Sequence, residues 1–173
     1  MMIYKEFPTL IVSYSSRPGE FGMCFQTFVQ WTYSQPVGPF PSEVIACLSE
    51  RSLVSSQRVF ANALHKLGHL KDVELAILSR WEEWLSANVA SNKIDIFIYV
   101  RTSPSVVIKR SQIRDRPEEI NLSLTYLTLL HELLDDWLLS RGGNLRTPVF
   151  IVNGDLPANT VLKDVEECLK FCC

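Results

Sequence analysis

The sequence predicts an α/β protein in which a parallel sheet is covered by helices on both faces. Three observations lead to this prediction. Apolar runs of strand length alternate with longer segments of helical period along the 173 residues. The run Ile96 to Val100 is followed at once by a helix start, because Ser103 is a capping residue type and Pro104 suits a first helical turn. A later run, Val149 to Val152, again precedes a segment of helix length, and this alternation is typical of parallel sheets.

The composition is that of a globular protein and excludes several classes of function. Hydrophobic residues make up 47% of the chain and charged residues 21%, which is ordinary for a folded domain. The formal net charge of −2 gives no reason to expect nucleic acid as a partner. No apolar run approaches the roughly 18 residues of a membrane span, and the first residues lack the features of a targeting peptide. We therefore expect neither nucleic acid nor membrane as a partner.

The five cysteines form neither a CxxC pair nor a Cys/His metal spacing. Cys168 and Cys172 stand four residues apart near the end of the chain, which leaves a zinc or redox role open. A mildly hydrophobic helix face in a reducing compartment explains them more simply. The sequence therefore predicts free thiols and an intracellular location, cytoplasmic or mitochondrial.

The first half of the chain is predicted to be mostly helical. Ile3 to Tyr14 fits a strand or a short helix, and Ser15 to Gly19 has the composition of a loop. Three further elements are expected, namely an amphipathic helix, a short buried strand and a helix closed by a glycine: Met23 to Tyr33, Val44 to Leu48, and Ser55 to Leu67 with Gly68.

The second half continues the alternation of strands and helices. Leu75 to Asn88 is predicted to be a helix whose apolar face carries Leu78, Trp81, Trp84 and Leu85. Leu122 to Leu139 is expected to be the longest helix, with five residues turned inward: Leu127, Leu130, Leu134, Trp137 and Leu138. Two strands and a final helix complete the series: Asp95 to Val100, Val149 to Val152, and Thr160 to Phe171.

Three arginines follow the strand that ends at Val100. Arg110 and Arg114 are four residues apart, so a continuing helix places them on one face, and Arg116 comes next. Guanidinium groups bind phosphate through paired N–H donors, so a convergent set predicts a polyphosphate ligand. The alternative is a solvated basic helix face neutralised by neighbouring acids. The preceding strand favours the ligand, because open α/β sheets bind ligands at the carboxyl ends of their strands.

The segment from Ile98 to Leu138 resembles the deoxynucleoside kinase family. The matching motifs are IYVRTSP, the three arginines, PEE, LTYL, HEL and DWL, in order and without a gap. Phe25-Gln26 and Glu50-Arg51-Ser52 extend the similarity, which covers roughly residues 18–155. The resemblance implies a three-layer fold of the P-loop kinase type, with residues 17–173 as one domain after an unmatched segment 1–16. It also implies ATP-dependent, magnesium-dependent 5′-phosphorylation of deoxyribonucleosides, in nucleotide salvage, by a homodimer.

The resemblance also assigns residues to the nucleoside. It implies that Gln26 recognises the nucleobase, and a primary amide offers a donor and an acceptor side by side for that purpose. Phe60 would stack on the base, Tyr33 would lie beside it, and Glu119 would bind the sugar 3′-hydroxyl. A small residue at Ser56, where deoxycytidine kinase has an acidic one, favours pyrimidine nucleosides such as thymidine. Without the resemblance, core packing would explain Phe60 equally well.

A second set of assignments concerns ATP. The resemblance implies that Glu50 lies near the magnesium and phosphates and that Arg51 reaches the acceptor 5′-oxygen. A surface ion pair between these two residues is the alternative. The three arginines would form a mobile lid over the donor phosphates, and two loop residues after the last strand would hold the adenine: Asn153 and Asp155.

Two parts of the family pattern are missing from this sequence. The Gly-rich loop GxxGxGK[ST], which holds the donor phosphates, has no counterpart, because no glycine is followed by Lys-Ser or Lys-Thr. The Glu-Pro segment whose glutamate serves as general base is also absent. We expect a truncated kinase that is weakly active or inactive. The alternative is a non-catalytic binding or assembly protein similar to the kinase-like accessory subunit of respiratory complex I.

Overall fold

The structure is a computed structural model, and it describes residues 8–35, 47–89, 94–116, 119, 122–140 and 147–172. The chain divides into two compact units. The helical unit comprises Met1–Val37, Glu50–Lys93 and Asp115–Asn121, and the sheet unit comprises Gly38–Ser49, Ile94–Arg114 and Leu122–Cys173. The predicted boundary between an unmatched segment 1–16 and a domain 17–173 stays a prediction.

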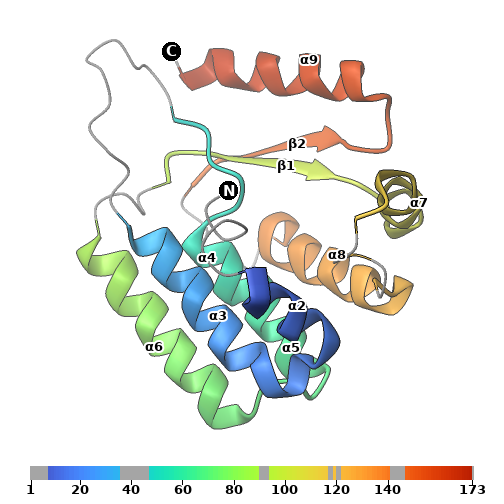
Figure 1. The fold of residues 1–173 in the computed structure, drawn as a ribbon. Helices are drawn as coiled ribbons and strands as arrows, with labels where there is room; N and C mark the ends of the chain where they lie inside the picture. The colour runs from blue at the N-terminus through green and yellow to red at the C-terminus, as the bar shows by residue number, and fades with distance from the viewer. Residues whose placement is uncertain are drawn as a thin grey trace. The chain divides into compact units, whose positions relative to one another are not determined.

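The helical unit begins with two helices where the sequence predicted less order. Helix α2 spans Pro8–Ser16 and α3 spans Pro18–Ser34, as Figure 1 shows in blue. The loop predicted at residues 15–19 is therefore wrong. Only Arg17 separates the two helices, because Pro18 can begin a helix where no backbone N–H is required. The helix predicted at Met23 to Tyr33 is confirmed, with its start five residues earlier.

One helical stretch follows, built from three segments. These are α4 (Leu53–Ser55), the π-helical η1 (Ser56–Ala61) and α5 (Asn62–Lys66). Gly68, with φ +74°, closes it as predicted. Its N–H donates to the His65 carbonyl at 2.9 Å, and the next N–H donates to the Leu64 carbonyl at 2.8 Å. These two bonds satisfy carbonyl groups at the helix end. Of the strand predicted at Val44 to Leu48, residues 44–46 lie outside the described residues, and residues 47 and 48 are not in a strand.

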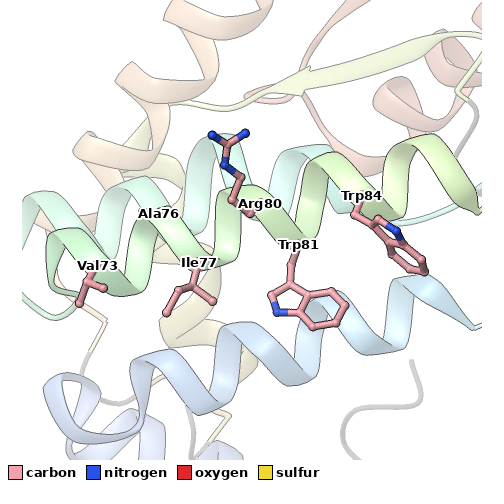
Figure 2. A pocket seen from close by; sticks show the side chains of 6 residues that line it. All are labelled: Val73, Ala76, Ile77, Arg80, Trp81 and Trp84. Carbon is pink, nitrogen blue, oxygen red and sulfur yellow. The ribbon is translucent and has the colours of Figure 1, made fainter.

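Helix α6 (Asp72–Asn88) corrects one prediction about the core. Leu78 and Leu85 are buried as expected, but Trp81 and Trp84 are 53% and 56% exposed. Consecutive helical residues are about 100° apart, so the two tryptophans lie on a second apolar stripe beside the buried leucines. Figure 2 shows this stripe, where side chains from one side of α6 line a shallow pocket of about 560 Å³: Val73, Ile77, Trp81 and Trp84.

The sheet unit contains the two described strands, which are parallel. Strand β1 (Phe97–Arg101) pairs with β2 (Val149–Asn153) in a register that sets Phe97 opposite Val149 and Arg101 opposite Asn153. Three helices accompany them: α7 (Pro104–Arg114), α8 (Leu124–Leu139) and α9 (Ala158–Leu169). A short 3₁₀ turn, η4 (Lys170–Cys172), follows α9. The predicted parallel pairing is confirmed, and the prediction that a first strand is missing stays a prediction.

Helices lie on both faces of this small sheet (Figure 1). On one face, the Phe97 ring meets the edge of Trp137 of α8 at a centroid distance of 5.2 Å. On the other, Phe150 stacks on Phe171 at 5.3 Å, next to α9. Side chains alternate between the faces of a strand, so each strand supplies both layers. Helix α8 has 16 residues and α3 and α6 have 17, so the prediction that α8 is the longest is wrong. None of the described helices is long and apolar enough to span a membrane.

Candidate functional site

The segment Glu50-Arg51-Ser52 is held in place from both sides. On one side, the Tyr33 hydroxyl donates to the Glu50 carbonyl oxygen at 3.2 Å. On the other, Ser52 caps the helical stretch by a reciprocal pair of bonds with Ser55, at 3.1 and 2.9 Å. Between these clamps, Arg51 has φ +66°, in the left-handed region. Such a backbone costs on the order of 1–3 kcal/mol and occurs most often at functional sites, where the surrounding structure enforces it.

The side chain of Arg51 lies against an aromatic ring. Its Cζ is 4.5 Å from the centroid of the Phe60 ring, which comes from the π-helical segment. A guanidinium in this position is attracted by the electrons of the ring. Burial raises the pKa of Tyr33, the Arg51 charge lowers it and the Glu50 charge raises it. Four predicted site residues are therefore in contact in one unit: Tyr33, Glu50, Arg51 and Phe60.

Gln26 lies on the same face of α3 as Tyr33 and is 2% exposed. The Ser56 hydroxyl, also 2% exposed, donates to its Oε1 at 3.2 Å. A second buried amide, Gln30, donates through Nε2 to Leu78 O at 3.0 Å and to Gln57 Oε1 at 3.3 Å. Polar side chains buried together in this way are unusual in a helical core, and they are stable only when they are hydrogen-bonded.

Glu119 belongs to the same unit and is partly buried. Its Oε1 lies 3.9 Å from Nη1 of Arg116. The helical unit thus contains all the residues assigned to the nucleoside, as well as Arg116 from the predicted lid. The direct contacts between them are those given above.

The loop after β2 is tied to the start of α7. Asp155 Oδ1 accepts from the Ser103 N–H at 2.8 Å and from the Ser103 hydroxyl at 3.0 Å. The backbone bond from Ser103 lowers the pKa of the Asp155 carboxyl. The hydroxyl that the sequence assigned to helix capping therefore bonds Asp155. Gly154 donates its N–H to the Arg101 carbonyl at 2.8 Å, and Asn153 Oδ1 accepts from the Asp155 N–H at 3.0 Å.

Arg110 binds the same loop. Its Nη1 donates to the Gly154 carbonyl at 2.6 Å, and its Nη2 donates to the carbonyls of Leu156 at 2.9 Å and Asp155 at 3.4 Å. The approach is close, since a Cβ on Gly154 would lie 1.9 Å from Thr102 Oγ1. Arg114, one turn further along α7, is exposed. These contacts lie at the carboxyl ends of both strands, where open α/β sheets bind their ligands.

The sequence did not reveal a second polar network at this edge. Asp135 of α8 accepts from Arg101 Nε at 2.9 Å, from Arg101 Nη2 at 2.7 Å and from the Tyr99 hydroxyl at 2.9 Å. His131 Nε2 lies 3.4 Å from the same carboxylate. The bonds from Arg101 lower the pKa of Asp135, while burial raises that of Tyr99. The partners are more than 30 residues apart in sequence, so no local pattern could have paired them.

A magnesium ion, which the resemblance implies, would have one candidate ligand here. Glu50 is exposed, and the described residues contain no group of three or more potential metal ligands. Magnesium at phosphoryl-transfer sites is held by one or two carboxylates together with the substrate phosphates. A single carboxylate beside Arg51 therefore fits such an ion when the phosphates supply further ligands.

The fold and these contacts define an α/β protein with polar groups at the carboxyl ends of parallel strands and a second polar site in a helical unit. The family model for deoxynucleoside kinases matches residues 4–170. The chain belongs to the deoxynucleoside kinase family.

Three relatives illustrate the match. A probable deoxycytidine kinase of fowlpox virus is 33% identical over 143 residues, 80% of this chain and 59% of that protein. The human mitochondrial thymidine kinase 2 is 31% identical over 150 residues, 84% of this chain and 55% of that protein. Rat deoxycytidine kinase is 32% identical over 125 residues, 69% of this chain and 47% of that protein. The chain therefore spans about half the length of the curated relatives it matches.

Proposed function

We propose that this chain binds a deoxyribonucleoside in its helical unit and takes part in the ATP-dependent phosphorylation of the 5′-hydroxyl. Family membership supports the reaction class. The observation that carries the nucleoside site is the group formed by Tyr33, Glu50, Arg51 and Phe60, because it combines a strained arginine, an aromatic ring and a carboxylate within one compact unit.

In this proposal, Gln26 pairs with the base, Phe60 stacks on it with Tyr33 nearby, and Glu119 accepts from the 3′-hydroxyl. The stacking role suits Phe60, whose ring already holds a flat cationic group at 4.5 Å. Base–aromatic stacking contributes about 1–3 kcal/mol per base. The amide role suits Gln26, because a buried amide is costly unless partners satisfy it.

The donor side of the proposal involves both units. Glu50 would hold magnesium and Arg51 would reach the 5′-oxygen, where charge develops in phosphoryl transfer. Arg110, Arg114 and Arg116 would face the donor phosphates. Asn153 and Asp155 would contact the adenine of ATP. The bonds from Arg110 to three carbonyls support a further role, namely to hold this loop in shape.

Turnover by these 173 residues is expected to be weak or absent, since they contain no GxxGxGK[ST] motif. A phosphate cradle supplies much of the electrostatic stabilisation in phosphoryl transfer. The rival proposal is a non-catalytic binding or assembly protein, similar to the kinase-like accessory subunit of respiratory complex I. Family relatives at comparable identity carry kinase names, which favours the first proposal.

Isothermal titration calorimetry tests the binding proposal directly. The purified chain is titrated with thymidine and with deoxycytidine, and phosphorylation of both is followed with ATP and Mg²⁺ beside the Arg51→Ala variant. Binding of either nucleoside, with any turnover lost in Arg51→Ala, supports the proposal. If neither nucleoside binds at millimolar concentration, the site assignment is refuted and the non-catalytic alternative gains.

The homodimer implied by the resemblance, and a cytoplasmic or mitochondrial location, belong to this proposal too. The helices at Met23 to Tyr33 and Leu122 to Leu139 are the faces predicted from the sequence. Sedimentation velocity of the chain at several concentrations measures its state. A single species at the monomer mass up to 100 times the lowest concentration would argue against the dimer.

A further inference from the structure

The amide of Gln26 differs from the other buried amides of the helical unit. Gln30 donates to two acceptors, and its partner Gln57 donates from Nε2 to Ser79 Oγ at 2.7 Å. Ser79 in turn donates to the Leu75 carbonyl at 2.9 Å. This chain of bonds is complete at both ends, so it serves the fold.

Gln26 has only half of its capacity used. Its Oε1 accepts from Ser56, and its Nε2 has no hydrogen-bond partner among the described residues. Within those residues, Trp137 Nε1 is the fully buried side-chain polar atom that lacks a partner. The Gln26 nitrogen is therefore within reach of solvent, although the residue as a whole is 2% exposed. A buried amide whose free end meets solvent has the features of a ligand contact.

Ser56 determines which end of the amide is free. Because its hydroxyl bonds Oε1, the two N–H donors of Nε2 are left for a ligand. Such an end pairs with an acceptor. The carbonyl at position 4 of thymine or uracil is an acceptor, whereas the amino group at position 4 of cytosine is a donor and would meet another donor. A mismatch of this kind in a buried site is costly, because it leaves polar groups unpaired.

We propose that Ser56 is a specificity-determining positioning residue, which holds the Gln26 amide by its oxygen so that the site prefers 4-keto over 4-amino pyrimidine nucleosides. This inference rests on the proposed nucleoside site. It assigns to the Ser56 hydroxyl a role in orienting Gln26 rather than in touching the substrate.

The test measures the dissociation constants of thymidine and deoxycytidine by calorimetry for the wild type and for Ser56→Ala. We expect the wild type to prefer thymidine. In Ser56→Ala the amide can turn, so the ratio of the two constants should move toward 1 by about 2- to 10-fold, the range expected for one hydrogen bond. Ser56→Thr keeps a hydroxyl and should retain most of the preference.

Ser79→Ala is the matched control. It removes the same hydroxyl from a buried amide chain of the same unit, one that does not contain Gln26. It should change thermal stability and leave the ratio unchanged. Thermal unfolding of each variant confirms that it is folded before titration.

The outcomes separate this inference from the proposed function. If the wild type binds neither nucleoside, the proposed function fails, and this inference fails with it. If the wild type binds both equally, or if Ser56→Ala keeps the wild-type ratio, the function stands and the role of Ser56 is overturned. The same conclusion follows if Ser79→Ala shifts the ratio as much as Ser56→Ala.

Discussion

The guanidinium of Arg51 lies over the ring of Phe60, with its Cζ 4.5 Å from the ring centroid. This contact joins a residue predicted to reach the acceptor 5′-oxygen to one predicted to stack on the base. It also explains how a strained arginine is kept in one orientation between Tyr33 and the helix cap at Ser52. The two halves of the proposed nucleoside site are therefore mechanically connected.

The first prediction concerns Phe60. Phe60→Leu keeps an apolar side chain but removes the ring, so both the stacking surface and the cation–π contact are lost. We expect thymidine affinity to fall about 5- to 100-fold, as estimated from base–aromatic stacking. Calorimetry measures it, with Phe150→Leu in the sheet unit as the control. Equal affinity for Phe60→Leu and the wild type would refute the stacking role.

The second prediction concerns the backbone of Arg51. Arg51→Ala and Arg51→Gly both remove the guanidinium, but only glycine adopts φ +66° without steric cost. Arg51→Gly should therefore be more stable than Arg51→Ala by about 1 kcal/mol. Chemical denaturation of the two variants gives this difference. An alanine variant as stable as the glycine variant would mean that the left-handed backbone relaxes once the side chain is gone.

The third prediction concerns the loop after β2. Gly154→Ala places a Cβ 1.9 Å from Thr102 Oγ1 and 3.0 Å from Val100 Cγ1, so the loop and the end of β1 must separate. We expect a loss of about 1–3 kcal/mol in unfolding free energy, the usual cost of overpacking. Gly19→Ala is the control, since its nearest neighbour atom would be 3.7 Å away. Equal melting temperatures for the two variants would contradict this geometry.

The fourth prediction concerns acid stability. Arg101, Tyr99 and His131 face Asp135, and the bonds from Arg101 lower its folded pKa below the usual 3.8. A lowered folded pKa stabilises the fold above pH 3.8, and this contribution is lost as the pH falls below that value. Asp135→Asn should therefore lose less stability than the wild type between pH 5 and pH 2. Urea unfolding across this range checks it. Parallel curves for the two proteins would show that another carboxylate is responsible.

Local patterns predicted a large part of the fold. The apolar period of Met23 to Tyr33, the Pro104 helix start and the Gly68 helix stop each depend on a few neighbouring residues, and all three appear in the structure. The loop at residues 15–19 was wrong because Pro18 can begin a helix as well as break one. The apolar face of α6 was wrong because periodicity cannot tell which of two adjacent stripes the core will cover.

The site was predictable only as a set of residue types. The sequence alone determined the family motifs, and with them the residues to consider: Gln26, Glu50, Arg51, Phe60, Glu119 and the arginines. Their roles stay predictions. Tertiary structure decided which partners these side chains meet, such as Ser56 for Gln26, the 154–156 carbonyls for Arg110 and Asp135 for Arg101. The physical reason is that a hydrogen bond depends on distance and direction between groups 30 or more residues apart, and only packing of the folded chain sets these quantities.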